Sequence, residues 1–459
     1  MPDTDAVTTS AGTGEAPAPA AAPPAAPPAA QSGWPRRVWG SLGPGLVTGA
    51  SDDDPSGIAT YAQAGAQFGF GLLWTALVTL PLMMAIQEIC DRTALATGKT
   101  LGELARAHFG QWARACIGVL IVALVVANTL NIAADLVAIG SGMALLRAGP
   151  SWLWALIAGA GITALIFLGG FARIQQVFKL LCLSLLSYVA VLFFAAVRWK
   201  TVGLDTLVPH VTWSKAYLSL LVAVLGTTIS PYLFFWQTAN RVEEMRAEDA
   251  GGANPVPLAR RTTLGARGKT RSSRFDVFTG MALSNLVMFA IITATASTLG
   301  LRKSTDITSA AQAAGALRPI AGPLASTLFA LGFIGSGMLA VPVLAGAGSA
   351  GLAGLLGRPW GLSLPPRKAP LFYVLLGAGT VGGTALTLTP VNPISLLVLV
   401  AIVNGIAAAP FLIVVMIISR NRPLMGENRN GSLAAVLGWA TVALMTAAAI
   451  AVIISLTGV

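Results

Sequence analysis

The chain has 459 residues, of which 55% are hydrophobic and only 10% are charged, and its mean hydropathy is +0.74. This composition excludes an ordinary soluble enzyme and predicts a polytopic membrane protein. The formal net charge is +11, but the basic residues lie in connecting segments rather than on one amphipathic face or among aromatic residues. Nucleic acid is therefore excluded as a partner.

Residues 1–33 are mostly Ala, Pro, Gly and Thr with a few acids, and they lack the basic start and apolar core of a signal peptide. We therefore expect a disordered cytoplasmic tail. Eleven apolar spans follow, several of them longer than a bilayer requires, so tilts or breaks are expected. The spans lie at approximately 43–68, 72–96, 115–146, 152–170, 175–197, 215–239, 276–300, 320–352, 370–389, 393–419 and 433–457.

These spans form a ten-helix core at 34–419 and an eleventh transmembrane helix within 420–459. The segment 240–274 is rich in Arg, Gly and acids, and we expect a flexible cytoplasmic loop there, close to anionic lipid. The run at 346–351 matches GxGxxG in form, but no strand precedes it, so it favours small-residue helix packing over nucleotide binding. The sequence has no CxxC pair and no histidine cluster, so it does not predict a zinc site.

The distribution of basic residues predicts the orientation. With the N-terminus in the cytoplasm, 22 of the 29 Lys and Arg residues fall in inside segments and seven in outside segments. The excess remains when 240–274 is left out. We expect a multi-pass protein of the plasma membrane, of the bacterial inner-membrane kind, with its N-terminus in the cytoplasm and its C-terminus outside.

The first span carries three consecutive acids followed by a proline, in the run SDDDPSG at 51–57. Pro55 has no N–H for the carbonyl of Ser51 and moves Asp54 out of helical dihedrals, so the helix should break there. Each Asp at the centre of a spanning helix costs roughly 2.5–3.5 kcal/mol on insertion scales. A broken helix with carboxylates at membrane depth predicts a binding site, and a solvated loop between two short helices is the alternative.

The sixth span carries a second break, as expected if the first five and next five spans form inverted repeats, at about 43–197 and 215–419. In the run GTTISPY at 226–232, Pro231 frees the carbonyl of Thr227. A proline kink without a site is the alternative for this span alone.

Together, the two breaks would bring the Asp54 carboxylate near the Thr227 carbonyl and the Ser230 hydroxyl. These are hard oxygen ligands, which suit Mg²⁺, Ca²⁺ or Mn²⁺ better than soft metals.

In order along about 40–430, the chain resembles the Nramp family of divalent-metal transporters. The resemblance rests on GPGLVTGASDDDPSGIATYAQAGAQFG, QEICDRTALATGKTLGEL, AADLVAIGSG, GTTISPYLFFWQ, DVFTGMALSNLVM and the LMG at 424–426. It implies the LeuT-type fold, an all-α polytopic membrane protein with two inverted five-helix repeats, here followed by an eleventh helix.

In that family the broken helices read Asp-Pro-Gly-Asn and Met-Pro-His, and the metal is held by the Asp, the Asn, the Met sulfur and a backbone carbonyl. By position the Asp is Asp54 and the carbonyl is that of Thr227. The chain departs from the family at three positions: Gly57 replaces the Asn, Ser230 the Met and Tyr232 the His.

Loss of the thioether removes a soft ligand, and Gly57 leaves room for an ion that keeps several waters, so the resemblance is closest to the branch associated with Mg²⁺ and Mn²⁺. Asp52 and Asp53 either draw the hydrated cation in or are solvated acids at the rim. Further candidates for an ion path or for support of the site are Ser51, Tyr232, Asp135, Asn285 and Asn404.

Proton coupling is expected to be weak or absent. The phenol of Tyr232 holds its proton at neutral pH, unlike the histidine it replaces. Ala138 stands where the third-helix motif usually has an acid, so a proton relay would rest on Asp54 and Asp135 alone.

The sequence therefore predicts a carrier for divalent metal ions, with the metal as substrate, membrane lipid as surroundings, and no cofactor, nucleotide loop or enzymatic centre. A proton-coupled Mn²⁺/Fe²⁺ symporter is the first alternative. An amino-acid or organic-cation symporter on the same fold is the second, and a passive ion channel the third.

Overall fold

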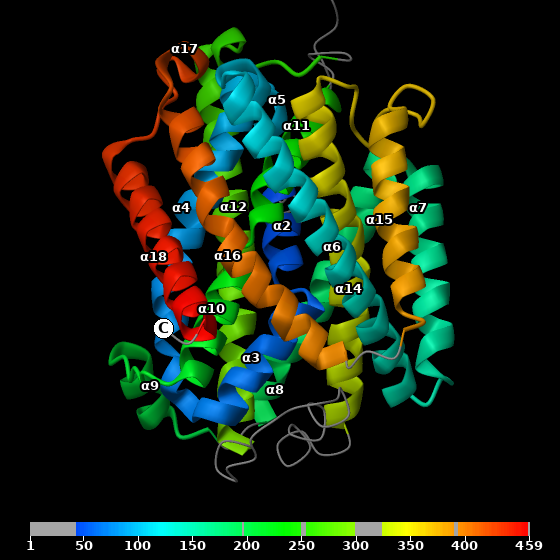
Figure 1. Cartoon of the computed structure of the whole chain (residues 1–459), viewed down its shortest axis with the longest axis vertical. Helices are drawn as coiled ribbons and strands as arrows, with labels where there is room; N and C mark the ends of the chain where they lie inside the picture. The colour runs from blue at the N-terminus through cyan, green and yellow to red at the C-terminus, as the bar shows by residue number, and fades with distance from the viewer. Residues whose placement is uncertain (1–42, 195–196, 249–253, 299–323, 390–392, 458–459) are drawn as a thin grey trace, which may run out of the picture. The chain divides into compact units, whose positions relative to one another are not determined.

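The computed structural model describes residues 43–194, 197–248, 254–298, 324–389 and 393–457 (Figure 1). Helices provide all the regular secondary structure of these residues. The tail predicted at 1–33 lies outside the described residues.

The helices are, in chain order, α2 Pro44–Asp52, α3 Pro55–Phe68, η1 Gly69–Leu72, α4 Trp74–Thr97, α5 Leu101–His108, α6 Gln111–Leu145, α7 Ser151–Leu181, η2 Cys182–Leu185, α8 Leu186–Phe194, α9 Trp199–Leu207, α10 Lys215–Thr228, α11 Pro231–Arg246, η3 Leu258–Arg260, α12 Thr263–Thr298, α14 Leu324–Leu356, α15 Pro370–Leu386, α16 Pro393–Arg420, α17 Arg422–Met425 and α18 Ser432–Thr457.

Each predicted span coincides with a helix, a pair of half-helices or part of a kinked helix. In the described residues, seven helical segments are long and apolar enough to cross a membrane, and two of them, Ser151–Leu192 and Lys215–Arg246, consist of consecutive helices. The segments Pro55–Leu72 and Trp74–Thr97 add a bent pair at 106°, and α15 is a shorter apolar helix. The fourth and fifth predicted spans are joined in the segment Ser151–Leu192, because α7 continues past Gly170, which interrupts it with a positive φ of 68°. The predicted spans outnumber the long helices because of this join, the short α15 and the break in the first span.

The predicted loop at 240–274 is much shorter in the structure. Helix α11 continues to Arg246 and α12 already begins at Thr263. The reason is charge pairing: Arg241 is only 2% exposed, and its Nε lies 2.5 Å from a carboxylate oxygen of Asp91. Paired charges tolerate burial, so the charged sequence that resembles a loop extends the helices.

Two kinds of close helix contact hold the core together. The GxGxxG run lies inside α14, where a Cβ on Gly346 would come within 2.8 Å of the Trp236 ring, so the run serves helix packing, as predicted. Helix α2 packs on α12 through glycines: a Cβ on Gly49 would lie 2.2 Å from the backbone of Gly280.

The half-helices of the two broken spans pair crosswise. Helix α2 contacts α11, and α3 contacts α10, so the first half of each broken helix lies beside the second half of the other. This is the arrangement of two antiparallel spans that break at the same level, and it places the two breaks side by side. Helices α6 and α14, the third spans of the two halves, pack against each other beside them.

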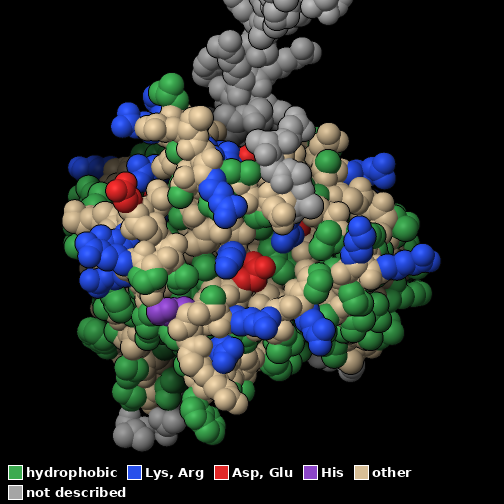
Figure 2. Space-filling model, turned by 90° about the horizontal axis from the view of Figure 1, so that it is seen from above, with side chains coloured by type: hydrophobic (Ala, Val, Ile, Leu, Met, Phe, Trp, Pro, Cys, Tyr) green, Lys and Arg blue, Asp and Glu red, His purple; other side chains and the backbone are tan. Residues whose placement is uncertain are grey.

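Lys and Arg side chains are spread over the face at which α5 and α17 lie (Figure 2). This is the end of the bundle to which the sequence assigns the cytoplasmic loops.

Replacing Gly49 with Val is expected to destabilise the protein by about 1–3 kcal/mol, because the new side chain would overlap the backbone of Gly280. Thermal unfolding of the detergent-purified protein measures this. Gly161→Val on α7 is the control, since nothing lies within 4 Å of a Cβ there. Equal melting temperatures for the two variants would contradict the α2–α12 contact.

Candidate metal site

The two breaks have the same backbone conformation. The residues that end the first half-helices, Asp53 and Ile229, have φ/ψ of −87°/49° and −115°/57°. The next residues, Asp54 and Ser230, are extended, at −65°/167° and −78°/136°, and each precedes a proline that begins the second half-helix. Proline at the first helical position needs no N–H partner there, so each proline ends one helix and starts another.

Each proline leaves one backbone carbonyl without its helical N–H partner. Hydroxyl groups of residues at the breaks lie within hydrogen-bond distance of both carbonyls. The carbonyl of Ser51 accepts a hydrogen bond from the Tyr232 hydroxyl at 3.0 Å. The Ser230 hydroxyl lies 2.8 Å from the carbonyl of Thr227 and 2.7 Å from that of Gly226, so the two carbonyls share its single hydrogen. Tyr232 therefore connects the second break to the first.

Asp54 is 1% exposed and caps α3. One carboxylate oxygen accepts hydrogen bonds from the Ser56 hydroxyl at 2.5 Å and the Gly57 N–H at 2.8 Å. The other accepts from the Asn131 amide at 2.8 Å and lies 3.4 Å from the Tyr232 hydroxyl. These neutral donors orient the carboxylate without cancelling its charge.

Asp52 and Asp53 are both 0% exposed, so in this conformation they are not solvated acids at a rim. Both turn toward α12, where the Ser284 hydroxyl lies 2.7 Å from Asp52 and 3.4 Å from Asp53. One oxygen of each carboxylate is buried without a hydrogen-bond partner. The three consecutive acids therefore diverge, two facing α12 and one facing α6.

A fourth buried acid, Asp135, lies on α6 and is also 0% exposed. The Asn131 amide lies between it and the first break, 3.4 Å from Asp135 and 2.8 Å from Asp54. The sequence analysis did not assign Asn131 to the site; its position one turn before Asp135 was the available signal. Ala138, one turn further, is buried and adds no charge.

These four acids have no basic partner in the part of the chain that the structure describes. The ion pairs among the described residues involve other carboxylates, and none includes Asp52, Asp53, Asp54 or Asp135. Within the same described ranges, no three His, Cys, Asp or Glu side chains are placed to hold one metal ion. An ion at the breaks would therefore depend on one carboxylate together with neutral oxygens and water.

Gly57 faces the second break. A Cβ there would lie 3.0 Å from Thr227 Oγ1 and 3.3 Å from the carbonyl of Asp52. Thr227 Oγ1 is itself buried without a partner. Beside it, the Tyr61 and Thr228 hydroxyls are 3.0 Å apart, joining α3 to α10. The two breaks thus meet at Gly57 with little spare room.

The two remaining candidates differ in position. Asn285 donates to the Thr79 hydroxyl on α4 at 3.1 Å, so the structure does not bring it to the breaks. Its neighbour Ser284, which sequence reasoning missed, faces the acids instead. Asn404 is buried on α16 with its Oδ1 unpartnered, next to Gly405, which packs on Gly226 of α10.

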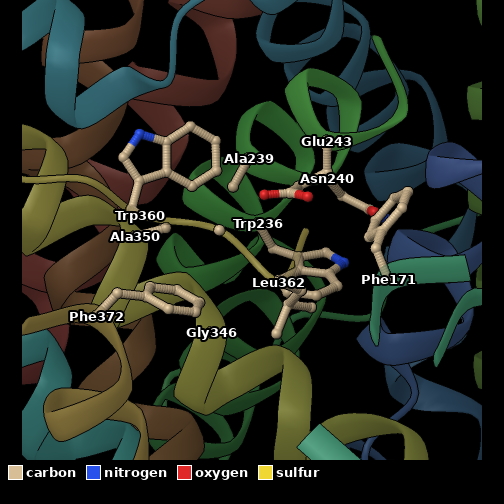
Figure 3. A pocket seen from close by; sticks show the side chains of 11 residues that line it. Phe171, Trp236, Ala239, Asn240, Glu243, Gly346, Ala350, Trp360, Leu362 and Phe372 are labelled. Carbon is tan, nitrogen blue, oxygen red and sulfur yellow. The ribbon is translucent and has the colours of Figure 1, made fainter. Parts of the chain in front are cut away.

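A small cavity lies along α11 beyond Tyr232 (Figure 3). Its volume is about 10 Å³, enough for roughly one water. Trp236 Nε1, Asn240 Nδ2 and Trp360 Nε1, on three of its lining residues, are buried donors without a partner. The cavity is far too small for an organic solute.

A sequence model of the family described as natural resistance-associated macrophage protein-like, or Nramp, matches residues 45–455. Among curated proteins, the divalent metal cation transporter MntH of Aeromonas hydrophila is 28% identical over 423 residues, covering 88% of this chain and 93% of that protein. The MntH of Acidiphilium cryptum is 26% identical over 407 residues, covering 86% of each.

Among solved structures, a manganese transporter of Eremococcus coleocola superposes with a TM-score of 0.72 at 17% identity, covering 94% of this chain and 89% of that chain. Mhp1, a nucleobase-cation-symport-1 family transporter, gives 0.53 at 13% identity, covering 90% and 92%. The expected fold is confirmed: an all-α polytopic membrane protein of the LeuT type, with two inverted five-helix repeats and an eleventh helix.

Tyr232→Phe is expected to lower the free energy of unfolding by about 1–3 kcal/mol, because the buried Ser51 carbonyl loses its donor. Thermal unfolding in detergent measures the loss. Tyr188→Phe is the matched control, since that buried hydroxyl makes only a 3.4 Å contact. A Tyr232→Phe variant no less stable than the control would show that the bond between the breaks contributes nothing.

Proposed function

This chain belongs to the Nramp family, and from that premise we propose that it carries divalent metal cations across a membrane by alternating access. The metal is its substrate, and the chain acts as a transporter rather than an enzyme. The relatives named above as divalent metal cation transporters support the substrate class.

The observation that carries the proposal is the group of four buried acids without a basic partner. An isolated carboxylate buried at low dielectric is strongly unfavourable, and within the described part of the chain none of these acids forms an ion pair with Lys, Arg or His. A divalent cation supplies the missing positive charge. The buried acids are therefore stabilised when a cation is bound, which favours binding of the ion.

We assign Asp54 as the charged ligand, with the Thr227 carbonyl and the Ser230 hydroxyl as neutral ones. The Ser230 hydroxyl already lies against the Thr227 carbonyl, and its oxygen retains lone pairs for a cation. Gly57 adds no ligand, and the approach of Thr227 Oγ1 and the Asp52 carbonyl leaves less room for water there than the sequence suggests. Asp52 and Asp53 add negative charge on the α12 side and attract the ion without binding it directly.

Among divalent ions, the donor set favours Mg²⁺ and Mn²⁺. Carboxylate, carbonyl, hydroxyl and water are hard oxygen ligands, and no thioether stands at Ser230 to favour softer ions. The Eremococcus coleocola protein is named a manganese transporter, which agrees with Mn²⁺ as one substrate. A proton-coupled Mn²⁺/Fe²⁺ symporter is the alternative function.

Weak or absent proton coupling follows from the residues around Asp54. Tyr232 donates to a backbone carbonyl and keeps its phenol proton at neutral pH, and Ala138 offers no acid. Uptake would then follow the metal gradient and the membrane potential, which favours a divalent ion entering by about 4.6 kcal/mol per 100 mV.

An organic-solute carrier is less well supported. Consecutive acids at the break would repel a substrate carboxylate, and Gly57 leaves only 3.0 Å between an added Cβ and Thr227 Oγ1. We place the protein in the plasma membrane, of the bacterial inner-membrane kind. Its basic loops and N-terminus lie in the cytoplasm and its C-terminus outside.

Asp54→Ala is expected to lower Mg²⁺ and Mn²⁺ uptake at least about tenfold, because the only charged ligand is lost. Proteoliposomes at fixed membrane potential, tested with Mg²⁺, Mn²⁺, Cd²⁺ and Ca²⁺, provide the measurement. Glu427→Gln, which removes an exposed acid, is the control and should transport normally.

In the same liposomes, a pH-sensitive dye should report constant internal pH during saturating metal uptake. Acidification in proportion to the metal dose would instead establish the symporter. Normal uptake by Asp54→Ala, or no divalent flux in the wild type, would refute the metal site and favour the organic solute.

Ser230→Met is expected to let Cd²⁺ be transported and to reduce Mg²⁺ transport, because a soft thioether replaces a hard hydroxyl at the second break. Competition of Cd²⁺ with Mn²⁺ uptake measures the change. Ser230→Ala separates the two effects, since it removes the hydroxyl without adding sulfur. If Ser230→Met leaves the order of metals unchanged, Ser230 does not select the ion.

A further inference from the structure

A groove of about 420 Å³ opens between α4, α12 and α18. Helix α18, drawn in red in Figure 1, lies beside α4, and α4 packs on α12. None of the residues at the two breaks lines this groove. Its charged lining residues are Glu88, Arg92 and Arg274, and most of the others are apolar or small.

The groove is polar at one end and apolar at the other. On each of the three helices, the polar lining residues are nearer the same end of the bundle. On α4 the lining runs from Pro81 to Arg92, about 16 Å toward the cytoplasmic end proposed above. On α12 Arg274 is nearer that end than Val277, and α18 begins there and continues to Leu437. This gradient matches a lipid molecule with its headgroup at the cytoplasmic interface.

Arg92 places an unused donor at the polar end. It is 7% exposed, and its terminal nitrogens bind the Arg429 carbonyl at 3.0 Å, the Asn430 side chain at 2.9 Å and Glu88 at 3.0 Å. Its Nε is buried without a partner. A buried guanidinium N–H without a partner is costly, so the position suits an anionic acceptor.

The N-terminus of α18 provides the second anion-binding feature. The first bond of this 26-residue helix runs from the Ala435 N–H to the Gly431 carbonyl. The N–H groups of Ser432, Leu433 and Ala434, which line the groove, therefore have no partner within the helix. Aligned peptide dipoles add positive potential at this point.

We propose that this groove binds one anionic glycerophospholipid. Its phosphodiester would lie between Arg92, Arg274 and the N-terminus of α18, with an acyl chain along Pro81 and Leu437. Two arginines against Glu88 leave one net positive charge, which matches a phosphodiester. The apolar half of the groove gives a free phosphate nothing to contact. The inference requires the membrane setting and does not depend on which ion is transported.

Native mass spectrometry of the full chain in detergent, titrated with phosphatidylglycerol or phosphatidylcholine, tests the proposal. We expect one phosphatidylglycerol retained per chain, with phosphatidylcholine bound more weakly. Arg274→Gln should bind phosphatidylglycerol about fivefold more weakly. Ala434→Trp, which fills the groove, should abolish the adduct. Arg271→Gln is the control, because that residue is exposed one turn earlier on α12 and does not line the groove.

The Arg274 side chain is 60% exposed, so Arg274→Gln will fold and keeps the test valid even if Ala434→Trp does not. Wild-type affinity in Arg274→Gln would overturn the proposal, as would equal retention of both lipids. Competition with inorganic phosphate shows whether the groove binds a lipid or only a phosphate group. If it displaces the lipid at equal concentration, the acyl chain contributes nothing and the site is a simple anion site.

Discussion

The organisation of this protein depends on the cost of placing negative charge in a low-dielectric interior. Three carboxylates at the first break and a fourth on the neighbouring helix α6 are buried, and among the described residues none of them forms an ion pair with a basic side chain. Such an arrangement is unfavourable unless a cation or protons neutralise it. The neutral donors around Asp54, from Ser56, Gly57 and Asn131, orient the carboxylate and leave its charge for a mobile partner.

The fold keeps these groups together by using each helix break to satisfy the other. Tyr232, on the second broken helix, supplies the hydrogen bond that Pro55 denies to the Ser51 carbonyl on the first. The crosswise pairing of the half-helices makes this contact possible. Freed backbone groups at membrane depth are therefore satisfied within the protein, as a hydrocarbon environment requires.

Sequence reasoning found both breaks because proline chemistry is local, and it found the helices because apolar length is local. It could not give the rotation of each helix. Successive residues differ by about 100°, so Asn285 faces α4 whereas Ser284 faces Asp52. The divergence of the three acids and the bridging place of Asn131 depend on tertiary packing in the same way. The helical structure of segments 240–246 and 263–274 was not predicted, because the pairing of Arg241 with Asp91 joins residues that are far apart in the chain.

That pairing belongs to a buried network that also holds the start of α2. The Asp276 carboxylate accepts hydrogen bonds from the N–H groups of Gly43, Gly45 and Leu46 at 2.7, 2.8 and 3.0 Å, and it also binds Arg241 at 3.1 Å. Moving the start of α2 away from α12 would break these three backbone bonds, whereas Asp276 would keep its ion pair with Arg241, which also binds Asp91 and Glu244. The start of the first half-helix is thus fastened to α12 by one carboxylate in addition to the glycine packing, so the position of α2 depends on a charge network that reaches Asp91 on α4.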